Sequence, residues 1–223
     1  MSARDGKSVG SADEREAILF DEIAQDIATQ GYSIRANAID ARLVQLLSEH
    51  VVEMPSSQFK RAGIGREEDH TLEDSIRGDE ICWISGECEA ETAWLGWAES
   101  LQQYLNRRLF LGLFSFESHF AHYAPGDFYK KHQDAFDGDA NRILSVVIYL
   151  NKQWREEDGG ELIVYSKETD ESLAKVIPGY GTLVIFLSEE FPHEVLPATQ
   201  DRYSIAGWFR VNTSNTARVD PPK

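Results

Sequence analysis

The second half of the chain, from Phe110 to Val211, consists of short apolar segments separated by turn residues. The segments are FLGLFSFESHFAHY, RILSVVIYL, GELIVYS, AKVIPGY, GTLVIFL, HEVLPA and RYSIAGWFRV. They recur at intervals of about ten residues, a spacing typical of antiparallel strands in a sandwich or barrel. No internal repeat is evident. The sequence therefore predicts a mainly β fold of two packed sheets.

The first half of the chain predicts helices that support these strands. A first helix is expected over residues 11–28, where Asp13 and Glu14 fall near the positive helix end. Asp40 is expected to cap a second helix. The apolar stripes of the three helices are expected at Ile18, Leu19, Ile23 and Ile27, then Leu43, Leu46, Leu47 and Val51, then Trp94, Trp97, Ala98, Leu101 and Leu105. We therefore predict a jelly roll with three helices packed on one of its sheets.

The length of 223 residues is that of one sizeable domain. We expect a disordered leader at residues 1–10, one domain at residues 11–210 and a polar tail at residues 211–223. Within the domain, residues 11–108 are expected to form the helical support. Residues 109–210 are expected to form the β core.

One polar segment interrupts the helical half. Residues 59–78, FKRAGIGREEDHTLEDSIRG, contain glycines and carry no sustained helical or strand period. Loops of about twenty residues inside compact domains are usually lids, binding loops or disordered segments. We interpret this segment as a substrate lid, with an ordinary solvated surface loop as the alternative.

The composition favours a soluble, cytoplasmic protein. The chain has 38 acidic and 22 basic side chains, and its formal net charge of -16 would repel a nucleic-acid backbone. The N-terminus has no apolar signal-peptide core, and no run of about 18 apolar residues suggests a membrane span. Cys82 and Cys88 do not make a disulfide framework, and without a CxxC-type pair we do not expect metal binding through sulfur.

Four residues in the β half have the spacing of a metal site with an anion anchor. His132 and Asp134 stand two positions apart, and side chains at i and i+2 of a strand project from the same face. His193 would complete the two-histidine, one-carboxylate triad of non-haem Fe(II) oxygenases. Arg202 follows one strand and one turn later, where an adjacent antiparallel strand could direct it into the same cavity. A guanidinium there suits the distal carboxylate of an α-keto acid.

These residues and several local motifs resemble the Fe(II)/2-oxoglutarate dioxygenases, and within them the prolyl 4-hydroxylases. The motifs are SIRGDEICWI, IYLNKQW, GGEL, FPHEV and RYSIAGWF, so the resemblance runs from about residue 75 to residue 210. The likeness is to the oxygen-sensing type that acts on hypoxia-inducible factor, and to its bacterial relatives. It implies a double-stranded β-helix in which His132, Asp134 and His193 bind Fe(II).

The resemblance also implies roles for residues around the metal. Arg202 would bind the C5 carboxylate of 2-oxoglutarate, with the Tyr149 hydroxyl beside it and Tyr123 along the same pocket. The residues implied on the substrate side are Tyr129, Trp208, Arg77 and Asp79. For Trp208 the alternative is a packing role. For Arg77 and Asp79 the alternative is a surface ion pair. The remaining histidines are expected to be ordinary: His50, His70, His119 and His122.

The activity implied by the resemblance is hydroxylation of a prolyl residue in a protein substrate. Fe(II), 2-oxoglutarate and O2 would be required, ascorbate is a further candidate cofactor, and succinate and CO2 would be the coproducts. The partner would present proline in a flexible segment, and a translation factor such as elongation factor Tu is one candidate. No nucleic-acid or membrane partner is expected.

Two alternatives to this function remain at the level of sequence. One is a 2-oxoglutarate oxygenase that acts on a small molecule or on nucleic acid, although the net charge argues against nucleic acid. The other is a cupin-like metal-binding module without turnover. Arg202 and Tyr149 argue against the module, because a simple metal binder has no use for a keto-acid anchor.

Overall fold

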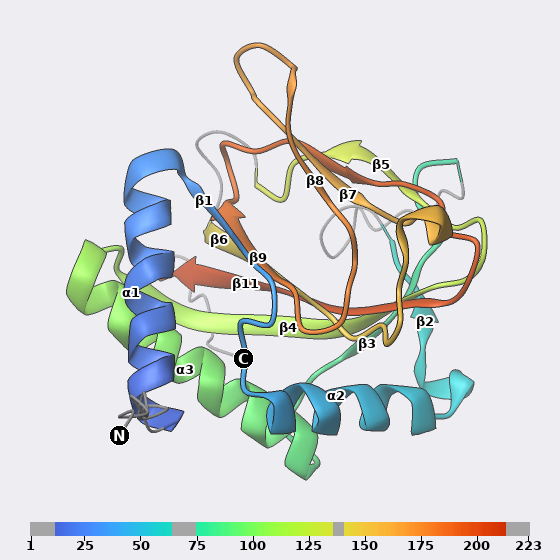
Figure 1. Ribbon diagram of the computed structural model, residues 1–223, viewed down its shortest axis with the longest axis horizontal. Helices are drawn as coiled ribbons and strands as arrows, with labels where there is room; N and C mark the ends of the chain where they lie inside the picture. The colour runs from blue at the N-terminus through green and yellow to red at the C-terminus, as the bar shows by residue number, and fades with distance from the viewer. Residues whose placement is uncertain (1–11, 64–74, 136–140, 213–223) are drawn as a thin grey trace, which may run out of the picture.

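The computed structural model describes residues 12–63, 75–135 and 141–212 (Figure 1). Its helices are α1 (Ala12–Gln30), α2 (Ala41–Glu53) and α3 (Glu89–Leu109), with short 3-10 turns at Ser56–Gln58 and Glu156–Asp158. Its strands are β1 (Tyr32–Arg35), β2 (Lys60–Arg61), β3 (Glu80–Trp83), β4 (Leu113–Tyr123), β5 (Tyr129–His132), β6 (Arg142–Tyr149), β7 (Leu162–Tyr165), β8 (Ser172–Val176), β9 (Leu183–Leu187), β10 (His193–Val195) and β11 (Arg202–Val211). The expected leader at residues 1–10 lies outside the described residues, as does the expected tail beyond residue 212.

The strands form two sheets, as the sequence predicts. The larger has the order β1-β9-β6-β11-β4-β3-β2 and the smaller the order β5-β10-β7-β8, and all paired strands run antiparallel. Figure 1 shows α2 and α3 below β4, with β5, β7 and β8 above it. This confirms a jelly roll whose helices support one sheet. No helix in the described part of the chain is long and apolar enough to cross a membrane.

The helix ends follow the local chemistry expected of them. Asp13 and Glu14 lie in the first turn of α1, and the helix ends at Gln30, just before Gly31, whose φ of +80° favours glycine. The side chain of Asp40 accepts a hydrogen bond from the Arg42 backbone N–H at 2.9 Å and so caps α2.

Two apolar stripes differ in detail from those predicted. In α1, Ile18 is 60% exposed and Phe20 is buried in its place. In α2, Val44 is buried beside Leu47 and Val51, whereas Leu43 is only half-buried. Both helices lie at the edge of the molecule, so each apolar stripe is narrow and a small rotation of the helix decides which side chain is covered.

Two apolar cores lie on opposite faces of the larger sheet. The helix-facing core includes Trp94, whose indole stacks on Trp97 with ring centroids 5.2 Å apart and donates to Ser118 Oγ at 3.1 Å. The tryptophans of α3 are therefore packing residues. The second core lies between the sheets and includes Tyr149 and Phe186. Every second residue of β4, β6 and β11 faces this inner core.

The helical half also contributes strands to the larger sheet. β1 pairs with β9 at one edge, and β3 pairs with β4 on the other side. β2 pairs with β3, and the Ala62 N–H donates to the Asp79 carbonyl at 3.0 Å, so the two ends of the expected lid lie together. Residues 64–74 of that lid lie outside the described residues.

Candidate metal centre and adjoining pocket

The two histidines and the aspartate of the predicted triad come together at one end of the smaller sheet. His132 ends β5 and pairs directly with His193, which begins β10. Asp134 lies beyond the end of β5 and not on the strand as expected, so it approaches from a bend. His132 Nε2 lies 3.7 Å from Asp134 Oδ1, and His193 Nε2 lies 3.6 Å from Asp134 Oδ2. One ligand atom from each residue lies within 4.8 Å of the others.

Backbone carbonyls fix both imidazole rings. The His132 Nδ1–H donates to the Lys130 carbonyl at 2.8 Å, and the His193 Nδ1–H donates to the Phe191 carbonyl at 3.0 Å. Since a carbonyl can only accept, each Nδ1 carries the proton and each Nε2 keeps its lone pair. This tautomer directs two nitrogen lone pairs toward the space beside Asp134, which is the arrangement a metal ligand needs.

A serine hydroxyl holds the Asp134 carboxylate. Ser145 Oγ donates to Asp134 Oδ2 at 2.6 Å and lies 2.9 Å from Ser188 Oγ. Burial, followed by the charge of His193, lowers the pKa of His132 to about 3. Burial alone would raise the pKa of Asp134, but the two histidines and the bond from Ser145 lower it to about 2. The His132 ring is therefore neutral and Asp134 ionised at neutral pH, and the donor set of two imidazoles and one carboxylate fits Fe(II).

A buried positive charge lies between the sheets. Arg202 is 2% exposed, its Nε donates to the Gly160 carbonyl at 2.9 Å, and its Nη1 donates to Ser204 Oγ at 3.4 Å. Its guanidinium carbon lies 4.9 Å from the ring centroid of Tyr123 and 5.0 Å from that of Tyr149. Among the described residues no carboxylate pairs with it.

The Tyr149 side chain lies beside this guanidinium. It is buried and has no hydrogen-bond partner among the described residues. Burial raises the pKa of Tyr149 to about 12, although the positive charge of Arg202 acts in the opposite direction, so the phenol keeps its proton. A donor hydroxyl and a guanidinium are thus available to one buried anion.

The expected relation of Arg202 to the histidines is wrong in one respect. Arg202 begins β11 in the larger sheet, whereas His193 lies in the smaller one, so they are not on adjacent strands. Both side chains still reach the space between the sheets, because the larger and the smaller sheet face each other. Gly160, from the GGEL motif, makes room for Arg202: it has a φ of +71°, and a Cβ there would lie 3.1 Å from Arg202 Cδ.

The residues expected on the substrate side form a connected group next to the triad. Arg77 and Asp79 make two hydrogen bonds, Nε to Oδ1 at 2.7 Å and Nη2 to Oδ2 at 2.6 Å. The Arg77 guanidinium lies 4.2 Å from the Tyr129 ring centroid, and the Tyr129 ring stacks on His132 at 3.5 Å. Asp79 is buried, so the pair is not the surface ion pair considered as an alternative.

Trp208 and His119 lie beside each other on the larger sheet and form a wall next to the triad. Spacing along the chain does not indicate a role for His119. Trp208 is half-buried, and Arg142 stacks on its ring at 3.7 Å. His119 is buried with its ring 5.4 Å from that of Trp208, and its Nδ1 has no partner among the described residues. Burial lowers the pKa of His119 to about 3, so the ring is neutral at pH 7. Ser145 was missed for the same reason, because a lone polar residue in an apolar strand has no distinctive spacing.

Comparisons with known proteins agree with this geometry. Residues 118–210 match the family model described as the 2OG-Fe(II) oxygenase superfamily. A crystal structure of a Pseudomonas putida prolyl-4-hydroxylase is 39% identical, with a TM-score of 0.78, over 86% of this chain and 99% of that one. The chain belongs to the 2OG-Fe(II) oxygenase superfamily. Oxygenases of this family use Fe(II), 2-oxoglutarate and O2.

Other relatives of this 2OG-Fe(II) oxygenase include two further proteins named as prolyl hydroxylases. A prolyl hydroxylase from Trichoplax adhaerens, in complex with a hypoxia inducible factor oxygen degradation domain peptide fragment, is 27% identical over 89% of this chain and 91% of that one, with a TM-score of 0.76. The human prolyl hydroxylase EGLN3 is 31% identical over 60% of this chain. Human Egl nine homolog 1 is 30% identical over the same share. This chain spans 59% of the former and 33% of the latter.

Proposed function

We propose that this 2OG-Fe(II) oxygenase hydroxylates a prolyl residue of a protein substrate. The observation that carries the proposal is the 39% identity to the Pseudomonas putida prolyl-4-hydroxylase over nearly the whole of that chain. When bound together, Fe(II), 2-oxoglutarate and O2 supply the oxidising power for C–H hydroxylation, with succinate and CO2 as coproducts. The protein supplies binding, orientation and exclusion of water.

His132, Asp134 and His193 are the proposed metal ligands. Their support is the fixed tautomer of both rings, the ionised carboxylate and the short separations of the three groups. Three protein ligands on an octahedral ion leave three positions for other molecules. The bond from Ser145 to Asp134 keeps the carboxylate in place when these positions exchange their occupants.

Arg202 is the proposed anchor for the C5 carboxylate of 2-oxoglutarate, with the Tyr149 hydroxyl as a second donor and Tyr123 as a wall of the pocket. An isolated charge in a protein interior is expensive unless an opposite charge accompanies it. Arg202 is buried without a carboxylate partner among the described residues, so a carboxylate ligand would supply the missing charge. A planar guanidinium can hold it with two parallel hydrogen bonds.

Tyr129, Trp208, Arg77 and Asp79 are the proposed substrate contacts. Arg77 joins the end of the expected lid to the metal site, because it donates to the Gly63 carbonyl at 3.3 Å and stacks on Tyr129. A peptide that contacts Tyr129 would therefore be next to a metal ligand, since that ring stacks on His132. The role of residues 59–78 as a lid stays a prediction.

The substrate protein, the compartment and a reductant complete the proposal. Elongation factor Tu is the first substrate candidate, because a translation factor offers flexible segments that can present proline. The free thiols of Cys82 and Cys88 are compatible with the reducing cytoplasm. Ascorbate is proposed as the reductant that keeps the iron in its Fe(II) state.

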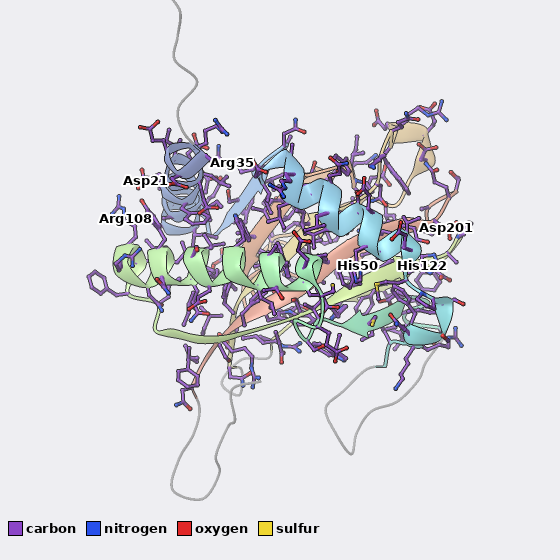
Figure 2. The ribbon with its side chains drawn as sticks, turned by 90° about the horizontal axis from the view of Figure 1, so that it is seen from below. Asp21, Arg35, His50, Arg108, His122 and Asp201 are labelled. Carbon is purple, nitrogen blue, oxygen red and sulfur yellow. The ribbon has the colours of Figure 1, made fainter. Side chains whose placement is uncertain are left out.

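The test is incubation of the Fe(II)-loaded protein with 2-oxoglutarate and either purified elongation factor Tu or cell extract. Peptide mass spectrometry should find one added oxygen on a prolyl residue. His132→Ala and His193→Ala should each abolish this product, because a three-ligand centre has no spare ligand. The matched control is His122→Ala, since His122 pairs with Asp201 at the surface, 2.7 Å away (Figure 2).

The same assay separates the alternatives. Succinate formed without modification of any protein would favour a small-molecule substrate. Absence of 2-oxoglutarate-dependent succinate with every extract would favour a metal-binding module and contradict the proposed activity.

A further inference from the structure

A second group of metal-ligating side chains lies on the helix side of the larger sheet. It comprises His50 in the last turn of α2, Cys88 at the N-cap of α3 and Glu91 in the first turn of α3. Figure 2 shows His50 near the end of α2, where α2 passes the start of α3. We propose that these three residues bind a zinc ion that joins the two helices.

The distances between the donor atoms suit a tetrahedral ion. Cys88 Sγ lies 3.6 Å from His50 Nε2, and His50 Nε2 lies 3.9 Å from Glu91 Oε1. Zinc binds such atoms at about 2.0–2.3 Å, which places neighbouring tetrahedral ligands roughly 3.3–3.6 Å apart. The first distance already matches this range, the second exceeds it by a few tenths of an ångström, and all three ligand atoms lie within 4.8 Å of one another. A water molecule would take the fourth position.

The carboxylate is already held in a fixed orientation. Glu91 Oε2 accepts three backbone hydrogen bonds, from Ser85 at 3.0 Å, Gly86 at 2.7 Å and Glu87 at 3.1 Å. These bonds leave Oε1 on the side of His50. A ligand that is held before binding loses little conformational freedom when the ion arrives.

The surroundings are negatively charged, which favours a cation. Burial, together with the charges of Glu91 and then Glu87, raises the pKa of the nearby Cys82 thiol, while Lys60 acts in the opposite direction. Glu91 and Glu87 thus both place negative charge near this end of α3.

The donor set selects a different metal from that of the first centre. A thiolate, an imidazole and a carboxylate are ligands that zinc accepts, whereas two imidazoles and one carboxylate suit Fe(II). This proposal departs from the expectation, on sequence alone, that no metal binds through sulfur. His50 and Cys88 are 38 positions apart and form no short motif. Only the packing of α2 against α3 brings them together.

A zinc ion at this site would stabilise the packing of α2 and α3 beneath the larger sheet. The His50 ring lies 5.5 Å from that of Phe120 in β4, next to His119 on the wall of the first centre. An ion bound here would hold α2 to α3 and keep both helices in place under the strand that carries that wall.

The test uses Co²⁺ as the probe, because cobalt bound to a thiolate gives a sulfur-to-metal charge-transfer band in the near ultraviolet. His132, Asp134 and His193 contain no sulfur, so the band reports on the second site alone. The wild-type protein with two equivalents of Co²⁺ should show the band, and Zn²⁺ should remove it. The band should be absent in Cys88→Ser and in His50→Gln but retained in Cys82→Ser, the matched control.

A second measurement needs no variant. Zn²⁺ should slow the alkylation of Cys88 in the wild-type protein and leave the alkylation rate of Cys82 unchanged. Mass spectrometry of the peptides that contain each cysteine measures both rates. Absence of the band in the wild-type protein, its persistence in Cys88→Ser, or unchanged alkylation of Cys88 would each overturn the proposal. In that case His50, Cys88 and Glu91 are only packing neighbours where α2 meets α3.

Discussion

Arg202 carries a positive charge in the space between the sheets, where it meets only neutral partners among the described residues. Arg202→Lys should weaken 2-oxoglutarate binding although the charge is kept, because an ammonium cannot form the two-pronged contact. Truncating one partner of a buried charged pair costs about 2–5 kcal/mol, so Arg202→Ala should lower the affinity roughly thirty-fold to several thousand-fold. Calorimetry with Mn²⁺ in place of iron measures the affinity for 2-oxoglutarate.

The control is Arg155→Ala, at a side chain that is 67% exposed, which should leave the affinity unchanged. Equal affinities in all variants would remove Arg202 as the anchor.

His119 makes a residue-level prediction about pH. Its pKa is about 3 in the folded protein because of burial, and about 6.5 when unfolded. Between these values the unfolded chain binds more protons, so stability falls as the pH drops from 6.5 toward 3. The slope is at most about 1.4 kcal/mol per pH unit. His119→Met should remove this contribution, and urea unfolding of the metal-free protein near pH 7 and near pH 5 measures it. Equal pH dependence in wild type and variant would contradict the prediction.

Individual site residues differ in how far the sequence could indicate them. The spacing of His132 and Asp134, and the order in which His193 and Arg202 follow, are properties of the chain itself. The sheet that carries each residue is not, because strand pairing joins segments far apart in sequence, and this is why the relation of Arg202 to His193 was predicted wrongly. Ser145, on β6, is connected to the candidate site by its hydrogen bond to Asp134. Such a contact leaves no pattern along the chain.

Strand β11 links the proposed 2-oxoglutarate anchor to the proposed substrate side. It begins with Arg202 and carries Trp208 on the same face. It lies between β4 and β6, and Gly207 faces the helix side. A Cβ at Gly207 would lie 2.7 Å from Ser118 Cβ and 2.8 Å from the Glu117 carbonyl oxygen. Gly207→Ala should therefore force the strands apart and destabilise the fold by about 1–3 kcal/mol.

The matched control is Gly96→Ala in α3. Nothing lies within 4 Å of a Cβ at Gly96, which is exposed. Alanine there should stabilise the helix by about 0.5–1 kcal/mol. Urea unfolding midpoints compare the two variants with the wild type. A neutral Gly207→Ala would mean that β11 can shift without strain.

At the level of elements, the strands with two buried faces were the most predictable. GTLVIFL and RILSVVIYL are strands β9 and β6, which lie inside the larger sheet and are covered on both sides. AKVIPGY was predicted less well: β8 is Ser172–Val176, and Pro178 and Gly179 lie beyond it. β8 is the edge of the smaller sheet and largely exposed, so backbone pairing defines it and its side chains carry no alternating pattern.

The whole molecule is held together across the inner core, where the two sheets contribute different parts of one site. His193 belongs to the smaller sheet and Arg202 to the larger. A metal ion with 2-oxoglutarate attached would therefore contact both sheets at once. Each ligand stabilises the folded state by binding it in preference to the unfolded chain. Metal and 2-oxoglutarate should accordingly act together on the unfolding temperature of the whole chain.

The expected size of this effect follows from mass action. At a 2-oxoglutarate concentration of about 100 times Kd, the folded state gains about 2.7 kcal/mol. For a chain of this size each kcal/mol raises Tm by about 2–4 °C, so 2-oxoglutarate added to the Mn²⁺-loaded protein should raise Tm by roughly 5–11 °C. The increment should be small without metal, because the keto acid then lacks its chelating partner. In Arg202→Ala the shift caused by Mn²⁺ should remain and the further increment at the same 2-oxoglutarate concentration should largely disappear. An increment of equal size without metal, or in Arg202→Ala, would mean that 2-oxoglutarate does not bridge the triad and the guanidinium.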